Sequence, residues 1–309
     1  WLPLLFFPSA CQIQQVTSRP LAISSAPLPT NMSAKYFLAA RQASFLNDIN
    51  ASAKFFLDAL ERDKLNPQLL QQSFEAQYRN GNIDIAAALA GQLERTNIKV
   101  PFAAEPAIAQ SIRAADWDAV IVLSDQLAED VTAAPLAGVI KSWAFAATGR
   151  GDAGLAHLAK ISQLSAYNNT AIPSHIQIQF ALLAEYLGHK EEAVLAATQL
   201  ANSSEISPKI ALQAAGILFR GHQEVKAKSL LKNLPYSFDR NHFNPDQLLP
   251  PNSQAAFIAN AIIDTAIASR DPQFADMAPE RLQLALYLDP ENNAGRFFLA
   301  QSLFGLGRF

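Results

Sequence analysis

Apolar residues along most of this chain recur every three or four positions and rarely alternate, which is typical of amphipathic helices. The segments 36–62 (YFLAARQASFLNDINASAKFFLDALER) and 83–95 (IDIAAALAGQLER) are two examples. Short breaks containing Gly, Asn or Pro separate such segments and mark helix ends. Alanine and leucine dominate the apolar positions, whereas runs of β-branched residues are scarce. The pattern therefore predicts an all-α protein.

The helical segments repeat with a period of about 34 residues. Three of them show an apolar stretch, then a glycine, then an alanine five positions later. These pairs are Gly81 and Ala86, Gly151 and Ala156, and Gly188 and Ala193. The predicted turn positions are Asn47, Gly81, Ala115, Gly151, Gly188 and Gly221. Such a period is typical of stacked two-helix units, because no single unit can bury its apolar face alone.

The repeated positions resemble those of the tetratricopeptide repeat family. The matching residues are Tyr36, Ala40, Asn47 and Ala59 in the first unit, and Ala285, Asp289 and Pro290 near the end. The resemblance covers about 33–309. It implies a right-handed α-solenoid of helix–turn–helix repeats, and it is nearly silent on the ligand.

Two segments depart from the repeat. Segment 234–254 contains four prolines and cannot be continuous helix. We expect a loop insertion there, either a plain one or one with a function. The last segment, 293–309, reads as the first helix of a further unit, with small Ala300 and turn Gly307. We therefore expect the solenoid to be truncated after this helix and the parent protein to continue. Side chains without their partner helix would be Phe297, Phe298, Leu303, Phe304 and Phe309.

The N-terminal segment 1–11, WLPLLFFPSAC, reads as the remnant of a signal peptide. Ser9, Ala10 and Cys11 resemble the bacterial lipoprotein signal, which implies lipid attachment at Cys11, although Pro8 stands where that signal usually has leucine. Ordinary signal-peptide cleavage and an apolar end without function remain alternatives. Residues 12–32 are expected to form a flexible linker. Cys11 is the only cysteine, which excludes an intrachain disulfide.

Composition and motifs favour neither nucleic-acid binding nor catalysis. Only 17% of the residues are charged and the net charge is −3, so no basic footprint is present. The five histidines lack metal-ligand spacing, and GRGDAG (149–154) lies at a helix–helix turn rather than after a strand. We expect no metal, no cofactor and no enzymatic activity. Trp117 and Trp143 are predicted to lie in the core.

In the tetratricopeptide family, an inner groove is lined by the first helix of each unit. Carrying those places over implies a partner-binding groove of Arg41, Gln71, Glu75, Tyr78, Lys141, Phe145, His175, Leu182 and Tyr186. The Lys/Asn/Arg carboxylate clamp of chaperone-binding members is not seen.

The resemblance favours a non-enzymatic scaffold that binds a protein or peptide partner. We expect it in the bacterial cell envelope, on the periplasmic side and lipid-anchored to a membrane. One alternative is a periplasmic component of a polysaccharide export or envelope-assembly machine. Another is a glycosidase-like enzyme, which would need two carboxylates about 5–9.5 Å apart in a cleft.

Overall fold

The structure is a computed structural model that describes residues 31–96, 98–100, 102–167, 173–203, 206–232, 234, 250–268 and 277–307. Within these ranges helices are the only regular secondary structure, which confirms the all-α prediction. The first described helix begins at Asn31, inside the range 12–32 expected for the linker, and the rest of that range lies outside the described residues. Cys11, and with it the predicted signal and lipid site, lies outside the described residues.

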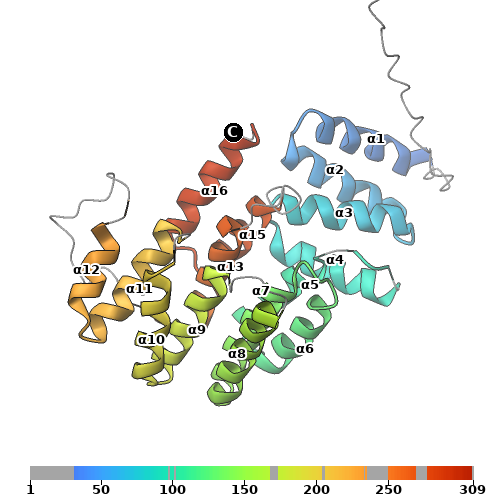
Figure 1. Ribbon diagram of the computed structural model, residues 1–309. Helices are drawn as coiled ribbons and strands as arrows, with labels where there is room; N and C mark the ends of the chain where they lie inside the picture. Colours follow the sequence, from blue (N-terminus) through green and yellow to red (C-terminus); the bar gives the residue numbers. More distant parts are fainter. Residues whose placement is uncertain are drawn as a thin grey trace, which may run out of the picture.

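Twelve consecutive helices stack in order along a curved array (Figure 1). They are α1 (Asn31–Phe45), α2 (Ile49–Arg62), α3 (Pro67–Arg79), α4 (Ile83–Arg95), α5 (Ala104–Arg113), α6 (Trp117–Leu127), α7 (Ala134–Ala147), α8 (Gly151–Tyr167), α9 (Ser174–Tyr186), α10 (Lys190–Ala201), α11 (Pro208–Arg220) and α12 (Glu224–Lys232). Each helix packs mainly on the helices before and after it in the chain. This arrangement confirms the predicted α-solenoid of two-helix units.

The turns inside the units share one hydrogen-bonded geometry. At each turn one residue has φ between 56° and 85°: Asn47, Gly81, Ala115, Gly149, Gly188 or His222. The next residue donates its N–H to a carbonyl five positions back, as Asn82 does to Gln77 at 3.0 Å. This is the Schellman ending of a helix.

Two predicted turn residues were wrong. Gly151 is already the first residue of α8, and Gly221 has φ −85°. The left-handed positions are Gly149 and His222. With this correction the first four turns follow one another at equal steps of about 34 residues.

The corrected turns also change the small buried position of each second helix. Ala86 and Ala193 are buried as predicted, but Ala156 is exposed. Gly154, five positions after Gly149, takes its place on α8. A Cβ on Gly154 would lie 2.4 Å from the Ser142 carbonyl oxygen of α7. Glycine is therefore required there by close helix packing.

We expect Gly154→Ala to lower the free energy of unfolding by about 1–3 kcal/mol, because α7 and α8 must move apart. Gly91→Ala is the matched control inside α4, where a Cβ would meet only an Arg95 nitrogen at 3.7 Å. That substitution should be neutral or stabilise by up to about 1 kcal/mol, since alanine favours helix. Urea denaturation followed by circular dichroism measures both. Equal effects of the two substitutions would contradict the close packing.

The last three described helices depart from serial stacking. They are α13 (Gln254–Ala268), α15 (Ala278–Leu288) and α16 (Asn293–Gly305). Figure 1 shows α13 and α15 inside the curve of the array. α13 packs on α7 and α9, α15 packs on α5 and α3, and the two pack on each other. Part of the inner face of the solenoid is thus covered by helices of the same chain.

The two predicted departures are only partly visible. Residues 234 and 250–253 are not helical, as expected for the loop 234–254, and residues 235–249 lie outside the described part. The segment after 293 forms α16, as predicted. Phe297 and Phe304 are 64% and 73% exposed, whereas Phe298 and Leu303 are half-buried and Phe309 is not described. Continuation of the array beyond α16 stays a prediction.

Candidate functional site

The inner face of the array is the candidate site, and α13 covers its middle part by an aromatic contact. The Phe257 ring of α13 stacks on Trp143 of α7, with ring centroids 4.2 Å apart and planes at 16°. Tyr186 of α9 packs edge-on against both rings, with each centroid distance 5.8 Å. Trp143 is fully buried, as predicted for a core position. Both α13 and the neighbouring helix α9 contribute to burying it.

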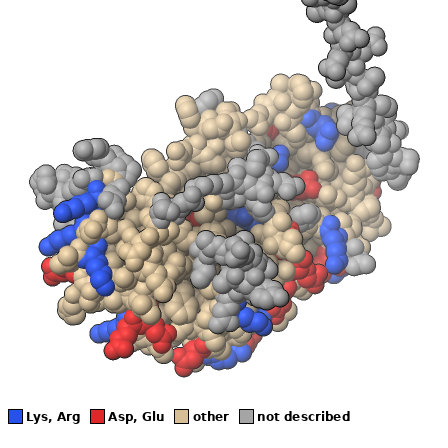
Figure 2. All heavy atoms as spheres, viewed as in Figure 1, with Lys and Arg blue, Asp and Glu red and all other residues tan. Residues whose placement is uncertain are grey.

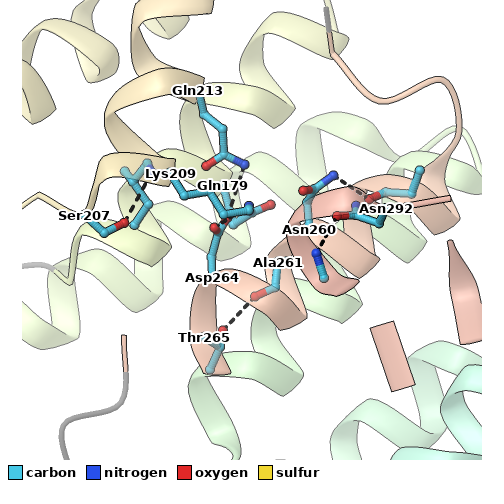
Figure 3. Close-up of polar contacts among 12 residues, drawn as sticks. Gln179, Ser207, Lys209, Gln213, Asn260, Ala261, Asp264, Thr265 and Asn292 are labelled. Carbon is cyan, nitrogen blue, oxygen red and sulfur yellow. Dashed lines mark hydrogen bonds and ion pairs between the residues drawn. The ribbon is translucent and has the colours of Figure 1, made fainter. Parts of the chain in front are cut away.

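Two helical turns after Phe257, α13 presents a buried carboxylate to the array (Figure 3). Asp264 is 0% exposed and accepts hydrogen bonds from Lys209 Nζ at 2.6 Å, Gln179 Nε2 at 3.1 Å and Gln213 Nε2 at 3.3 Å. Gln179 also accepts from Trp143 Nε1 at 3.1 Å. The aromatic and carboxylate contacts are therefore one connected network.

The second occupant, α15, is held by a buried ion pair. Arg281 Nη2 donates to Glu105 Oε1 of α5 at 2.9 Å, and the two side chains are 2% and 1% exposed. The Tyr78 hydroxyl of α3 donates to the other Glu105 oxygen. Burial and the adjacent Glu105 charge raise the pKa of Tyr78 well above its ordinary value. Burial by itself would lower the pKa of Arg281, but the charge and hydrogen bond of Glu105, together with Tyr78 and Asp130, raise this pKa above its ordinary value.

Further polar contacts join α15 and α13 to the array. Glu280 lies 3.6 Å from Arg79 Nε of α3, and the Tyr287 hydroxyl donates to Asp84 of α4. At the start of α13, Gln254 Nε2 donates to the Tyr186 hydroxyl at 2.6 Å. The occupying helices are thus tied to the array by specific side-chain pairs from end to end.

The predicted groove residues fall into three groups. His175, Leu182 and Tyr186 lie with Gln179 on one stripe of α9, which faces α13, and Tyr78 faces α15. Leu182 and Tyr78 are buried, so in this conformation they are not open to a partner. Gln71 and Glu75 share the stripe of Tyr78, two turns and one turn earlier respectively, and hydrogen-bond to each other at 2.9 Å. Arg41 on α1 is exposed, and these three remain accessible.

Lys141 and Phe145 require a correction. Lys141 Nζ pairs with Asp125 of α6 at 2.5 Å, and the Phe145 ring packs edge-on against His157 of α8. They face the outer helices, on the side of α7 opposite Trp143. The family register carried over from sequence was displaced by about half a helical turn in this unit.

Sequence reasoning missed the residues that make the contacts. On the array these are Glu105, Gln179, Lys209 and Gln213; on the occupants they are Phe257, Asp264, Glu280 and Arg281. One signal was present in the sequence. Asp264 is a lone charge in a helix that is apolar on all sides, and such a helix is typically buried.

The remaining surface offers little chemistry. Charged side chains lie mostly around the edge of the face shown in Figure 2, and much of that face is uncharged. Within the described residues, no group of three or more His, Cys, Asp or Glu side chains is arranged to hold a metal ion. Nor is any described helix both long and apolar enough to span a bilayer.

Two surface clefts lie away from the occupied groove. One of about 280 Å³ lies between α8, α9 and α10, beside Phe180 and Leu195. The other, of about 560 Å³, lies between α4, α5 and α6, beside Gly91 and Leu123. Neither includes a residue of α13 or α15 in its lining.

His175 makes the site sensitive to pH. Burial lowers its pKa, and the facing Asp264 carboxylate opposes this only in part. The unfolded chain therefore takes up this proton at higher pH than the folded chain, and stability is lost as pH falls below about 6.5.

We expect His175→Gln to lose less stability than the wild type between about pH 7.5 and about pH 5.5. Urea midpoints at the two pH values measure this. His222→Gln, at an exposed turn position, should keep the wild-type loss. The interpretation fails if both variants respond to pH as the wild type does.

Comparison with known proteins finds a similar fold but no similar sequence. No protein-family model matches the chain, and no curated protein matches it. A solved tetratricopeptide repeat protein from Parabacteroides merdae ATCC 43184 superposes with a TM-score of 0.52 at 12% identity, over 88% of this chain and 99% of that chain. At this identity the likeness shows the fold alone. This chain therefore has a tetratricopeptide-like α-solenoid fold.

Proposed function

We propose that this protein is a non-enzymatic scaffold of the bacterial cell envelope whose inner face binds a helical segment of a partner protein. The observation that carries this proposal is the occupied groove. The inner face holds helices α13 and α15 through stacked rings, hydrogen bonds and ion pairs. A surface that binds a helix of its own chain in this way has the shape and chemistry to bind a helix of another.

The buried carboxylates of the groove support a role in binding rather than in catalysis. Glu105 pairs with Arg281, Asp264 with Lys209 and Glu280 with Arg79. A hydrolytic pair would need two carboxylates facing each other across a cleft open to substrate. These three instead each face a cation on an opposing helix.

Photo-crosslinking in cells tests the binding face. A photoreactive residue at Gln71, on the accessible part of the inner face, should give a discrete crosslinked species with a partner protein. The same residue at Lys160, exposed on α8, is the control and should not give that species. Identical products at both positions, or none at Gln71, would refute the proposal.

The envelope location rests on the lipoprotein-like residues Ser9, Ala10 and Cys11. We expect cells grown with a clickable fatty acid to label the wild-type protein and not Cys11→Ala. Labelled protein should also sediment with membranes, because lipoprotein processing attaches more than one acyl chain. Equal labelling of both proteins would rule out lipid attachment at Cys11.

A further inference from the structure

The surface beneath α13 recognises two side chains of that helix. We call this surface the α13 cradle, defined by Trp143, Gln179, Tyr186, Lys209 and Gln213. Its aromatic part stacks on Phe257, and its polar part binds the Asp264 carboxylate. Phe257 and Asp264 are two helical turns apart, so they project from the same face of α13. The cradle thus selects a helix with a ring and a carboxylate at this spacing.

The polar half of the cradle is better suited to selection than to permanent packing. A buried ion pair such as Lys209–Asp264 stabilises no more than well-packed apolar residues of the same volume would. Its effect is to reject helices that lack the carboxylate, because they would leave Lys209 without its charge partner. Lys209 is only 11% exposed, which makes that rejection strong.

α13 also leaves the cradle incompletely satisfied. Among the described residues the buried Gln213 Oε1 atom has no hydrogen-bond partner, although Gln213 Nε2 donates to Asp264. A buried acceptor without a donor is unfavourable. A helix with a donor side chain next to its carboxylate would make every contact of α13 and this one in addition. Such a helix can compete with α13 for the same surface.

We propose that the α13 cradle is the partner-recognition site of the scaffold and that α13 is an internal competitor for it. This inference rests on the proposed scaffold function and adds the kind of partner: an amphipathic helix with an aromatic ring and, two turns later, a carboxylate. Partner and α13 exclude each other. The apparent affinity for the partner is therefore the intrinsic affinity multiplied by the fraction of molecules in which α13 is displaced.

The test uses the full chain and a fluorescent, hydrocarbon-stapled peptide of residues 254–268. The staple compensates for the low helicity of so short a peptide. A second peptide carrying Phe257→Ala and Asp264→Asn is the probe control. The chains compared are the wild type, Asp264→Asn and Thr265→Ala. Within the described part of the chain, the Thr265 side chain hydrogen-bonds to Ala261 of its own helix and to no residue of the array, so its variant controls for substitution in α13.

A locked chain completes the set. Tyr186→Cys and Gln254→Cys, in a Cys11→Ser background, replace two side chains that meet at 2.6 Å. A short bismaleimide joins the two thiols and ties α13 to the cradle. The same chain with both thiols capped separately is its matched control.

We expect Asp264→Asn to bind the first peptide at least about tenfold more tightly than the wild type, because more of its molecules have an open cradle. Thr265→Ala should bind as the wild type does, and the second peptide should not bind. The joined and capped chains both lack the Tyr186 ring of the cradle, so both should bind the peptide more weakly than the wild type does. The joined chain should bind it still less than the capped chain, because only the joined chain has α13 tied to the cradle. Binding by Asp264→Asn no tighter than wild type, with an unchanged circular dichroism spectrum, would overturn the proposal. Equal binding by the joined and the capped chains would also overturn the proposal. If Asp264→Asn loses its helical circular dichroism signal, this second comparison alone decides.

Failure here is distinguishable from failure of the scaffold function. Crosslinking at Gln71 reports a partner on the accessible inner face whether or not α13 moves. If that crosslink forms while the peptide does not discriminate among the chains, the competitor role is refuted and the scaffold function stands.

Discussion

Arg281→Ala is expected to lower the free energy of unfolding by about 3–5 kcal/mol. The substitution leaves the Glu105 carboxylate, 1% exposed, without its cation. It also leaves the Tyr78 hydroxyl bonded to an uncompensated buried charge. Urea denaturation followed by far-UV circular dichroism measures the loss. α15 should detach from α5 before the array unfolds, and hydrogen exchange of residues 278–288 reports that step.

Two controls separate the buried charge from the loss of an arginine. Arg296→Ala removes an ion pair with Glu291 whose side chains are 50% and 85% exposed, and it should cost less than about 1 kcal/mol. The double variant Glu105→Gln with Arg281→Met should recover most of the loss, because it removes both charges and keeps an acceptor for Tyr78. If Arg281→Ala behaves like Arg296→Ala, the buried pair does not hold α15 in place.

Phe257→Ala is expected to cost about 3–5 kcal/mol by opening a cavity against Trp143. Phe257 is 3% exposed, and its ring contacts both Trp143 and Tyr186. In a background with Trp1→Phe and Trp117→Phe, the remaining fluorescence comes from Trp143. That fluorescence should become more accessible to acrylamide and shift to the red.

Phe297→Ala is the matched control for Phe257→Ala. Phe297 is 64% exposed on α16, so its truncation should change stability by no more than about 0.5 kcal/mol. The accessibility of Trp143 to acrylamide should stay at the wild-type level. A large loss in both phenylalanine variants, or unchanged quenching in Phe257→Ala, would show that the stacked pair does not hold α13.

The repeat could be predicted because it depends on residues that are close together in the sequence. A left-handed turn residue recurs in each described unit from α1 to α12, and a small residue stands five positions later in all of these units except the third, which has Val120. The turn at Gly149 was misplaced by two residues because Gly151 is equally permissive in sequence. Only the backbone shows which glycine has φ +76°. The same uncertainty of register moved Lys141 and Phe145 from the outer side of α7 to the predicted groove.

The candidate site could be predicted only in part. The α9 stripe of His175, Leu182 and Tyr186 does line the inner face, because helical periodicity relates residues of one helix to each other. That α13 covers this stripe does not follow from periodicity. An all-round apolar helix must be buried, but its sequence does not say against which surface.

The sequence by itself determined the two-helix unit, the turns that close it and the curved array, since these depend on contacts between residues close in the chain. Only the tertiary structure decided that α13 and α15 turn back into the concave face and that Glu105 and Asp264 find their cations there. The physical reason is the separation of the partners. Glu105 and Arg281 are 176 residues apart, and contacts of that kind depend on the shape of the whole array.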